Sequence, residues 1–128
     1  MIEILVSPAR SKLRDTRRQL RERLATEVRV DPFTVAALEV VANELIGAAV
    51  ETGMREPLVL DVEVFARLTS VRVRCPHNVD LRDEPFGIRE RVLQGLAFAW
   101  GKRTYADGSV DLWAEVANPR RASGATTV

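Results

Sequence analysis

Alternating hydrophobic and polar residues mark three segments of the chain, and a period of two predicts strands with one buried face. The segments are "PLVLDVEVFA" at residues 57–66, "SVRVRC" at 70–75 and "VDLWAEV" at 110–116. A fourth segment, "IEILV" at residues 2–6, is short and rich in β-branched residues, which also predicts a strand.

The polar face of the three alternating strands carries charges in an informative order. Its charged residues are acidic in 57–66, basic in 70–75 and acidic in 110–116. Because opposite charges on neighbouring strands attract, the basic strand is expected to lie between the two acidic ones. Phe65 and Trp113 also fall on this outward face, and we interpret these two large aromatic residues as a candidate protein interface.

Three segments have the features of helices. Ser-Pro opens the first, residues 7–26, and Asp-Pro opens the second, residues 31–52, which Gly53 should end. A third helix is expected over residues 88–100, with Trp100 on its apolar side.

An Asp-Gly turn at residues 107–108 predicts a closing hairpin between 102–106 and 110–116. The resulting order predicts a two-layer α/β sandwich, with a mixed, mainly antiparallel sheet and helices on one face. We expect residues 1–117 to form a single domain. The small, polar residues of 118–128 are expected to be a disordered tail.

The composition is that of a soluble globular protein, with 46% hydrophobic and 29% charged residues among 128. The chain has no run of about 18 apolar residues and no signal-peptide pattern at its start, so a cytoplasmic location is expected. Cys75 is the single cysteine, which rules out an internal disulfide. Cys75 and His77 are too few to close a structural zinc site, so no metal site is expected.

The charge of the chain is concentrated in one predicted helix. Residues 10–24, "RSKLRDTRRQLRERL", hold seven basic and two acidic side chains, a local charge of +5, although the whole chain carries only +1. Arg14, Arg17, Arg18 and Arg21 are therefore candidate contacts for an acidic partner. Nucleic acid is the alternative partner, but the segment lacks the interleaved aromatic residues that would favour it.

Three further segments resemble, in order and spacing, parts of the histidine-kinase-like (GHKL) ATPase fold. "NELIGAAVETG" at 43–53 is similar to the ATP-binding helix of that fold, and "VRVRC" at 71–75 ends where the family has an adenine-binding aspartate. "GLAFAWGKRTYADGSVDLWAEV" at 95–116 is similar to the last helix and closing hairpin. The resemblance spans residues 2–117, is nearest to the anti-sigma-factor serine kinases of bacteria, and implies a Bergerat-like sandwich.

The resemblance also implies a nucleotide pocket, and this chain departs from it at three positions. Glu44 keeps the place of the general base, and Gly87 keeps one of two expected glycines. Ala48 stands where the family has a magnesium-binding asparagine, and a methyl group has no lone pair to offer. Cys75 replaces the adenine-binding carboxylate, and Arg89 replaces the second glycine, where a side chain obstructs the approach of phosphate to the backbone. The pocket is therefore expected to be vestigial.

These observations favour a regulatory protein-binding module of the anti-sigma-factor type, a pseudo-ATPase for which no catalytic residue, ATP or magnesium is expected. The resemblance implies a sigma factor or an anti-anti-sigma protein as partner, and homodimerisation. One alternative is an active ATP-dependent serine kinase with an altered pocket, in which Asn43 or Asn78 substitutes for the missing ligand. The other is a nucleic-acid-binding regulator that uses helix 10–24.

Overall fold

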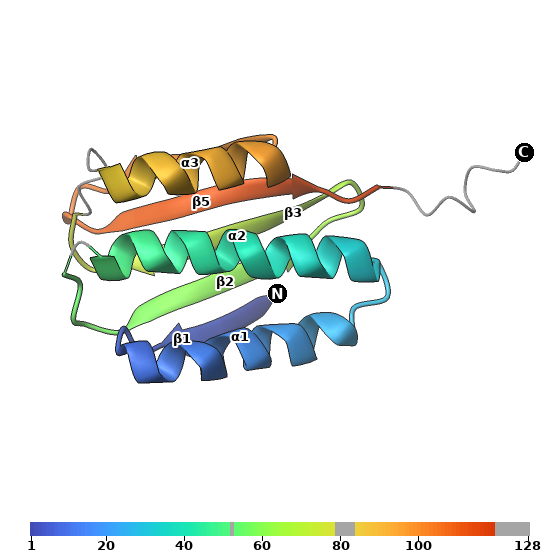
Figure 1. Ribbon diagram of the computed structural model, residues 1–128, viewed down its shortest axis with the longest axis horizontal. Helices are drawn as coiled ribbons and strands as arrows, with labels where there is room; N and C mark the ends of the chain where they lie inside the picture. The colour runs from blue at the N-terminus through green and yellow to red at the C-terminus, as the bar shows by residue number, and fades with distance from the viewer. Residues whose placement is uncertain (52, 79–83, 120–128) are drawn as a thin grey trace, which may run out of the picture.

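The computed structural model describes residues 1–51, 53–78 and 84–119, with backbone only for 84–88. The elements in chain order are β1 (Ile2–Val6), α1 (Arg10–Ala25), α2 (Pro32–Glu51), β2 (Leu58–Val64), β3 (Leu68–Cys75), α3 (Glu84–Leu96), β4 (Ala99–Thr104) and β5 (Val110–Ala117) (Figure 1). The strands form one sheet in the order β1-β2-β3-β5-β4. Every neighbouring pair of described strands is antiparallel, so the sheet is entirely antiparallel, whereas a mixed, mainly antiparallel sheet was expected.

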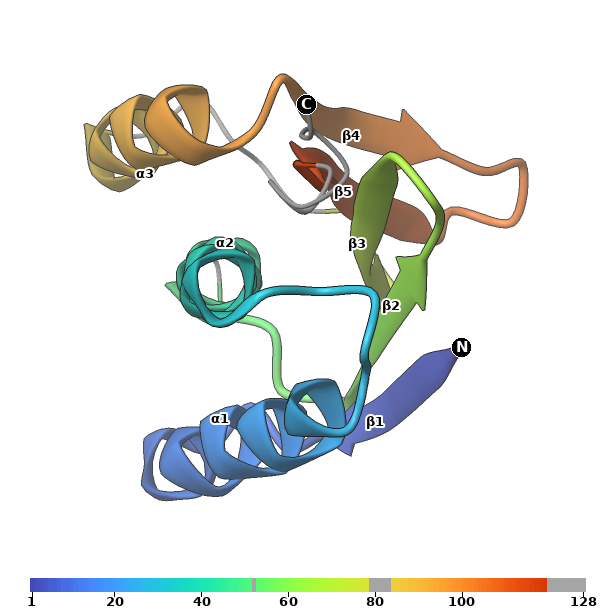
Figure 2. The ribbon, with the colours of Figure 1, turned by 90° about the vertical axis from the view of Figure 1, so that its right-hand side faces the viewer.

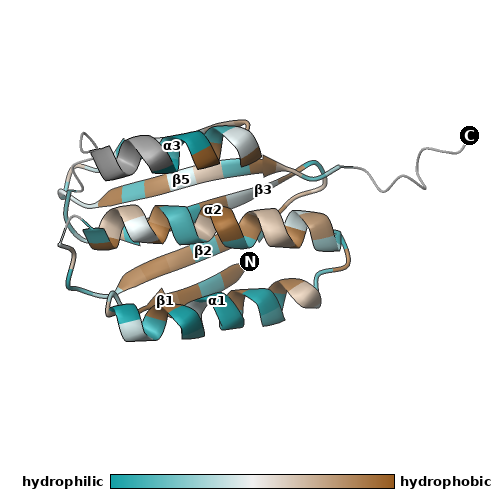
Figure 3. Cartoon of the chain, viewed as in Figure 1, coloured by the Kyte–Doolittle hydropathy of each residue, from teal (hydrophilic) through white to brown (hydrophobic). Residues whose placement is uncertain are grey.

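The molecule has two layers, because all three helices pack on the same face of the sheet (Figure 2). The two-layer α/β sandwich expected from the sequence is therefore confirmed. α2 lies between α1 and α3 and is the most apolar helix (Figure 3). Its buried side chains, among them Leu38, Val41 and Leu45, form the centre of the hydrophobic core. By length and composition alone α2 could also cross a membrane, a test that the core helix of a soluble protein passes as well.

The order of the strands follows the charges on their outward face, with β3 between β2 and β5 as expected. Asp61 lies opposite Arg72, and Arg74 lies opposite Asp111. Arg72 donates a hydrogen bond to Asp61 at 2.9 Å, which is the main reason that the pKa of Arg72 is raised.

Both aspartates on this outward face are nearly inaccessible to solvent, although no helix covers this face of the sheet. Asp61 is 3% exposed and Asp111 is 2% exposed. Arg72 and Arg74 reach the carboxylate of Asp111, and the hydroxyl of Tyr105 donates to it at 2.6 Å. Long side chains on neighbouring strands thus cover the short acidic ones.

The starts of the first two helices differ in how well the sequence predicted them. α1 begins at Arg10, and its cap position, Ala9, makes no side-chain capping bond, so the expected start at Ser7 was wrong. β1 continues to Val6, so residues 7–9 are needed to turn the chain out of the sheet. For α2 the prediction is confirmed, because the Asp31 carboxylate accepts a hydrogen bond from the Thr34 amide at 2.8 Å.

The end of α2 agrees with the prediction from the sequence, whereas the bounds of α3 do not. Gly53, two residues after the last residue of α2, has a φ of 91°, the left-handed conformation that ends helices, while Thr52 lies outside the described residues. The third helix was expected over 88–100 but covers Glu84–Leu96.

Trp100 therefore belongs to a strand, and the expected strand 102–106 is instead β4 (Ala99–Thr104). The reason is pairing with β5, because the amide of Phe98 already donates to the carbonyl of Glu115 at 3.0 Å. The half-buried Trp100 packs against the core from β4.

The first residue of the expected tail is held in place. Asn118 is buried, accepts a hydrogen bond from Thr69 Oγ1 and donates one to the carbonyl of Phe65, both at 2.8 Å. Residues 120–128, where the rest of the expected disorder falls, lie outside the described part of the chain.

Candidate functional site

Two of the residues expected in a vestigial nucleotide pocket are in direct contact. Arg89, on α3, donates to the carboxylate of Glu44, on α2, at 3.2 Å. It also pairs with Glu51, about two turns further along α2. The Arg89 side chain is only 15% exposed and that of Glu44 is 16% exposed. Arg89 therefore joins α3 to two carboxylates of α2, and Glu44 is not an unpartnered base.

Gly47 makes this contact sterically feasible. Glu44, Gly47 and Glu51 are spaced three and four residues apart, so they share one face of α2. A Cβ atom at position 47 would lie 2.5 Å from Nη1 of Arg89, closer than atoms can approach. The guanidinium therefore occupies the space that a side chain at position 47 would take.

This arrangement was not predicted from the sequence, although part of its signal is present there. The spacing of the two glutamates around Gly47 is visible in the sequence. What the sequence does not show is that α3 lies beside this face of α2 and that Arg89 reaches it.

Ala48 and Cys75, the other two departures from the family pattern, are both in the hydrophobic core. Burial raises the pKa of the Cys75 thiol to about 12, and the charge of Asp111 adds to the shift. The thiol therefore stays protonated near neutral pH and offers no charged acceptor to an adenine amino group. Gly87 lies on α3 within 84–88, where only the backbone is described.

The residues weighed as metal ligands and as substitutes lie in separate places. Cys75 is buried, whereas His77 is exposed and pairs with Glu56. Asn78 accepts a hydrogen bond from Lys102 at 3.2 Å. Among the described residues, no group of three or more His, Cys, Asp and Glu side chains is placed to hold a metal ion.

The structure places the two aromatic residues of the expected sheet interface apart. Trp113 lies in the row of Asp61 and Arg72, while Phe65 follows β2 four positions beyond Asp61, roughly 13 Å along the strand. Trp113 is partly buried because its indole packs over Gly101 on β4, where a Cβ atom would lie 3.2 Å from the ring. Phe65 is 45% exposed. They therefore do not form one continuous aromatic patch.

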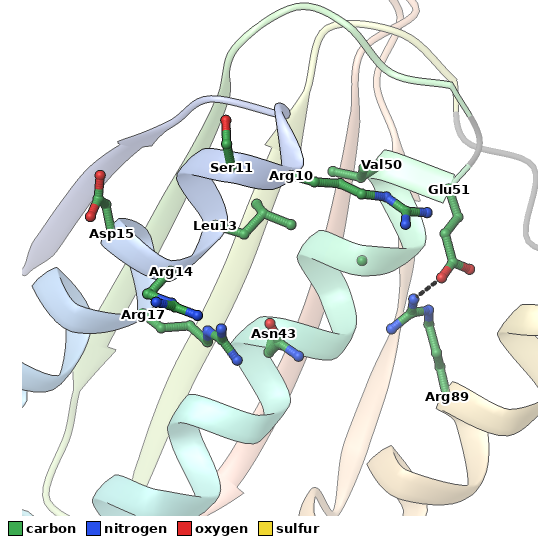
Figure 4. A pocket seen from close by; sticks show the side chains of 11 residues that line it. Arg10, Ser11, Leu13, Arg14, Asp15, Arg17, Asn43, Val50, Glu51 and Arg89 are labelled. Carbon is green, nitrogen blue, oxygen red and sulfur yellow. Dashed lines mark hydrogen bonds and ion pairs between the residues drawn. The ribbon is translucent and has the colours of Figure 1, made fainter.

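A hollow lies on the helix side of the molecule (Figure 4). We call it the α1–α2 groove; it has a volume of about 600 Å³. Its lining residues come mainly from α1 and α2, with one from α3: Arg10, Ser11, Leu13, Arg14, Asp15, Arg17, Asn43, Gly47, Val50, Glu51 and Arg89.

Of the four arginines expected to contact a partner, two line the groove and two do not. Arg14 and Arg17 line it and point toward α2 (Figure 4). Arg18 pairs with Asp15 at 3.3 Å, and Arg21 reaches Glu39 on α2 at 2.9 Å. Arg10, which the sequence analysis did not single out, joins Arg14 and Arg17 in the groove.

Comparison of the chain with models of known protein families gives no match, and comparison with curated proteins gives none either. The arrangement of the side chains is therefore the basis for assigning a function.

Proposed function

We propose that this protein is a regulatory protein-binding module on an ATPase-like sandwich, and that it acts without using a nucleotide. Its mode of action would be that of a bacterial anti-sigma factor, which occupies a sigma factor or is itself occupied by an anti-anti-sigma protein in the cytoplasm. The observation that carries the proposal is the ion pair between Glu44 and Arg89.

This ion pair opposes the proton abstraction that a serine kinase of this kind would need. A general base must reach the proton that it removes, and the Glu44 carboxylate already accepts a hydrogen bond from Arg89. Displacing Arg89 would leave a largely buried carboxylate without its partner, which is costly.

The neighbouring positions add no compensating ligand. Ala48 has no donor or acceptor atom in its side chain for a magnesium ion. Cys75 keeps its proton because burial raises the pKa of its thiol to about 12. An active kinase would therefore need different residues for the base contact, the metal and the adenine.

Thermal unfolding with and without nucleotide tests the proposal. A ligand that binds only the folded state adds roughly 2.7 kcal/mol of stability at 100 times its dissociation constant. We expect millimolar ATP with magnesium to leave the melting temperature unchanged, both for the wild type and for Ala48→Asn, which restores only one ligand. A clear magnesium-dependent rise for the wild type would instead favour the serine-kinase alternative.

A further inference from the structure

The arginines of α1 fall into two classes by what they contact. Arg18 bonds Asp15, Arg21 bonds Glu39, and Arg23 donates to the backbone carbonyl of Glu3 at 3.2 Å. These arginines stabilise the fold through contacts within the protein.

The second class consists of Arg10, Arg14 and Arg17, the three that line the α1–α2 groove. Within the described part of the chain, no acidic side chain pairs with any of them. They are spaced four and three residues apart, so they share one face of α1, where like charges repel and weaken the helix. The fold thus keeps three exposed cations together without an acidic partner among the described side chains.

The groove also offers apolar surface beside these cations. Leu13 of α1 and Val50 of α2 are partly buried and contribute to its lining. Further along α2, Val40 is 41% exposed and Phe33 is 83% exposed. Phe33 and Val40 are seven residues apart, so they lie along one line of α2, beyond the residues that line the groove.

We propose that the α1–α2 groove binds an acidic amphipathic helix of a partner protein. Carboxylates of that helix would pair with Arg10, Arg14 and Arg17, and its apolar side would cover Leu13 and Val50. This inference rests on the proposed protein-binding function and adds to it the chemistry and the place of the partner. Amphipathic helices bind other proteins in grooves of this kind through apolar residues spaced by one helical turn.

The spacing of the arginines favours a helix over a small anion. Arg10 and Arg17 are seven residues apart, so their Cα atoms are separated by roughly 10 Å along α1. A single small anion would have to draw all three guanidinium groups together against their mutual repulsion. A helix with carboxylates at the same spacing can meet each of them.

The test uses a synthetic helical peptide of about 18 residues as the probe, long enough to form several helical turns. It carries leucine on one face and glutamate at positions four and three apart beside that face, with a fluorescent label for anisotropy. The matched control peptide has lysine in place of each glutamate. We expect the full-length protein to bind the glutamate peptide, with an affinity that falls as salt is added, and not to bind the lysine peptide.

Two variants with the same loss of charge locate the binding. Arg14→Gln with Arg17→Gln removes two groove cations, and we expect affinity for the glutamate peptide to fall roughly tenfold. Arg55→Gln with Arg67→Gln removes two exposed arginines that do not line the groove, and less than a twofold change is expected. Thermal melts of both variants establish that they are folded.

Three outcomes would overturn the inference: no binding of the glutamate peptide, equal binding of the lysine peptide, or an equal loss in the control variant. Duplex DNA that displaces the peptide, and that itself binds the groove variant more weakly, would make nucleic acid the occupant and would also overturn it. Each of these results is independent of the ATP melt. If the peptide experiment fails and ATP leaves the melting temperature unchanged, only this inference is rejected. Magnesium-dependent stabilisation by ATP rejects the proposed function.

Discussion

Arg89 and Arg14 approach α2 from opposite sides, but their surroundings differ. Arg89 comes from α3, is largely buried, and lies between Glu44 and Glu51 over Gly47. Arg14 comes from α1, is exposed, and faces an open groove where no described acidic side chain pairs with it. The same residue type thus joins two helices on one side of α2 and leaves a charged surface open on the other.

The difference shows which side of α2 is filled by contacts within the protein and which side is open to a partner. On the α3 side, the ion pairs, Gly47 and the buried Ala48 and Cys75 fill the region where the resemblance places a nucleotide. On the α1 side, the described contacts reveal no structural task for Arg10, Arg14 and Arg17. We infer that the α3 side now stabilises the domain and that the α1 side carries recognition.

The largest expected effect comes from removing the charge of Arg89. Arg89→Met leaves Glu44 largely buried and unpaired, so we expect a loss of about 2 kcal/mol in the free energy of unfolding, less than for a fully buried pair because Glu51 is partly exposed. Arg14→Met is the matched control and should change it by no more than about 0.5 kcal/mol. Urea unfolding measures both. Equal effects would mean that the two sides of α2 do not differ in the way described.

The next effect concerns the buried thiol on the filled side. Because the pKa of Cys75 rises from an ordinary 9.0 to about 12 on folding, the unfolded chain loses this proton first as pH rises. Stability is therefore fully present below pH 9 and is lost between pH 9 and 12. From pH 8 to 10, the wild type should lose roughly 1.4 kcal/mol more than Cys75→Ala. Parallel pH curves for the two proteins in urea unfolding would show that the thiol is not protected by folding.

The smallest effect separates two helical glycines. At Gly95, on the exposed face of α3, an added Cβ meets no atom within 4 Å, so Gly95→Ala should gain about 0.5 kcal/mol from helix propensity. At Gly47 the same change displaces Arg89 from its carboxylates. We expect Gly47→Ala to be less stable than Gly95→Ala by about 1 kcal/mol in thermal or urea unfolding. A gain in both variants would show that Arg89 moves aside at little cost.

The strands and the long central helix could be predicted from the sequence because their signals are local. The alternation in 57–66, 70–75 and 110–116 marks strands wherever they lie in the fold. The sign of the outward charges even placed β3 between β2 and β5, because neighbouring strands put opposite charges in direct contact. Asp31 and Gly53 likewise bound α2 through hydrogen bonding and backbone conformation within a few residues.

The contacts on which the proposed function rests were decided only by the tertiary structure. Trp100 joined a strand because β5 supplied hydrogen-bond partners to that segment, a contact that no local pattern reports. Glu44 met Arg89, 45 residues later, because α3 packs beside α2. The sequence alone determined that α1 is rich in arginine. Which of its arginines have partners and which line a groove depends on the reach of long side chains between packed helices, and this depends on how the helices are placed.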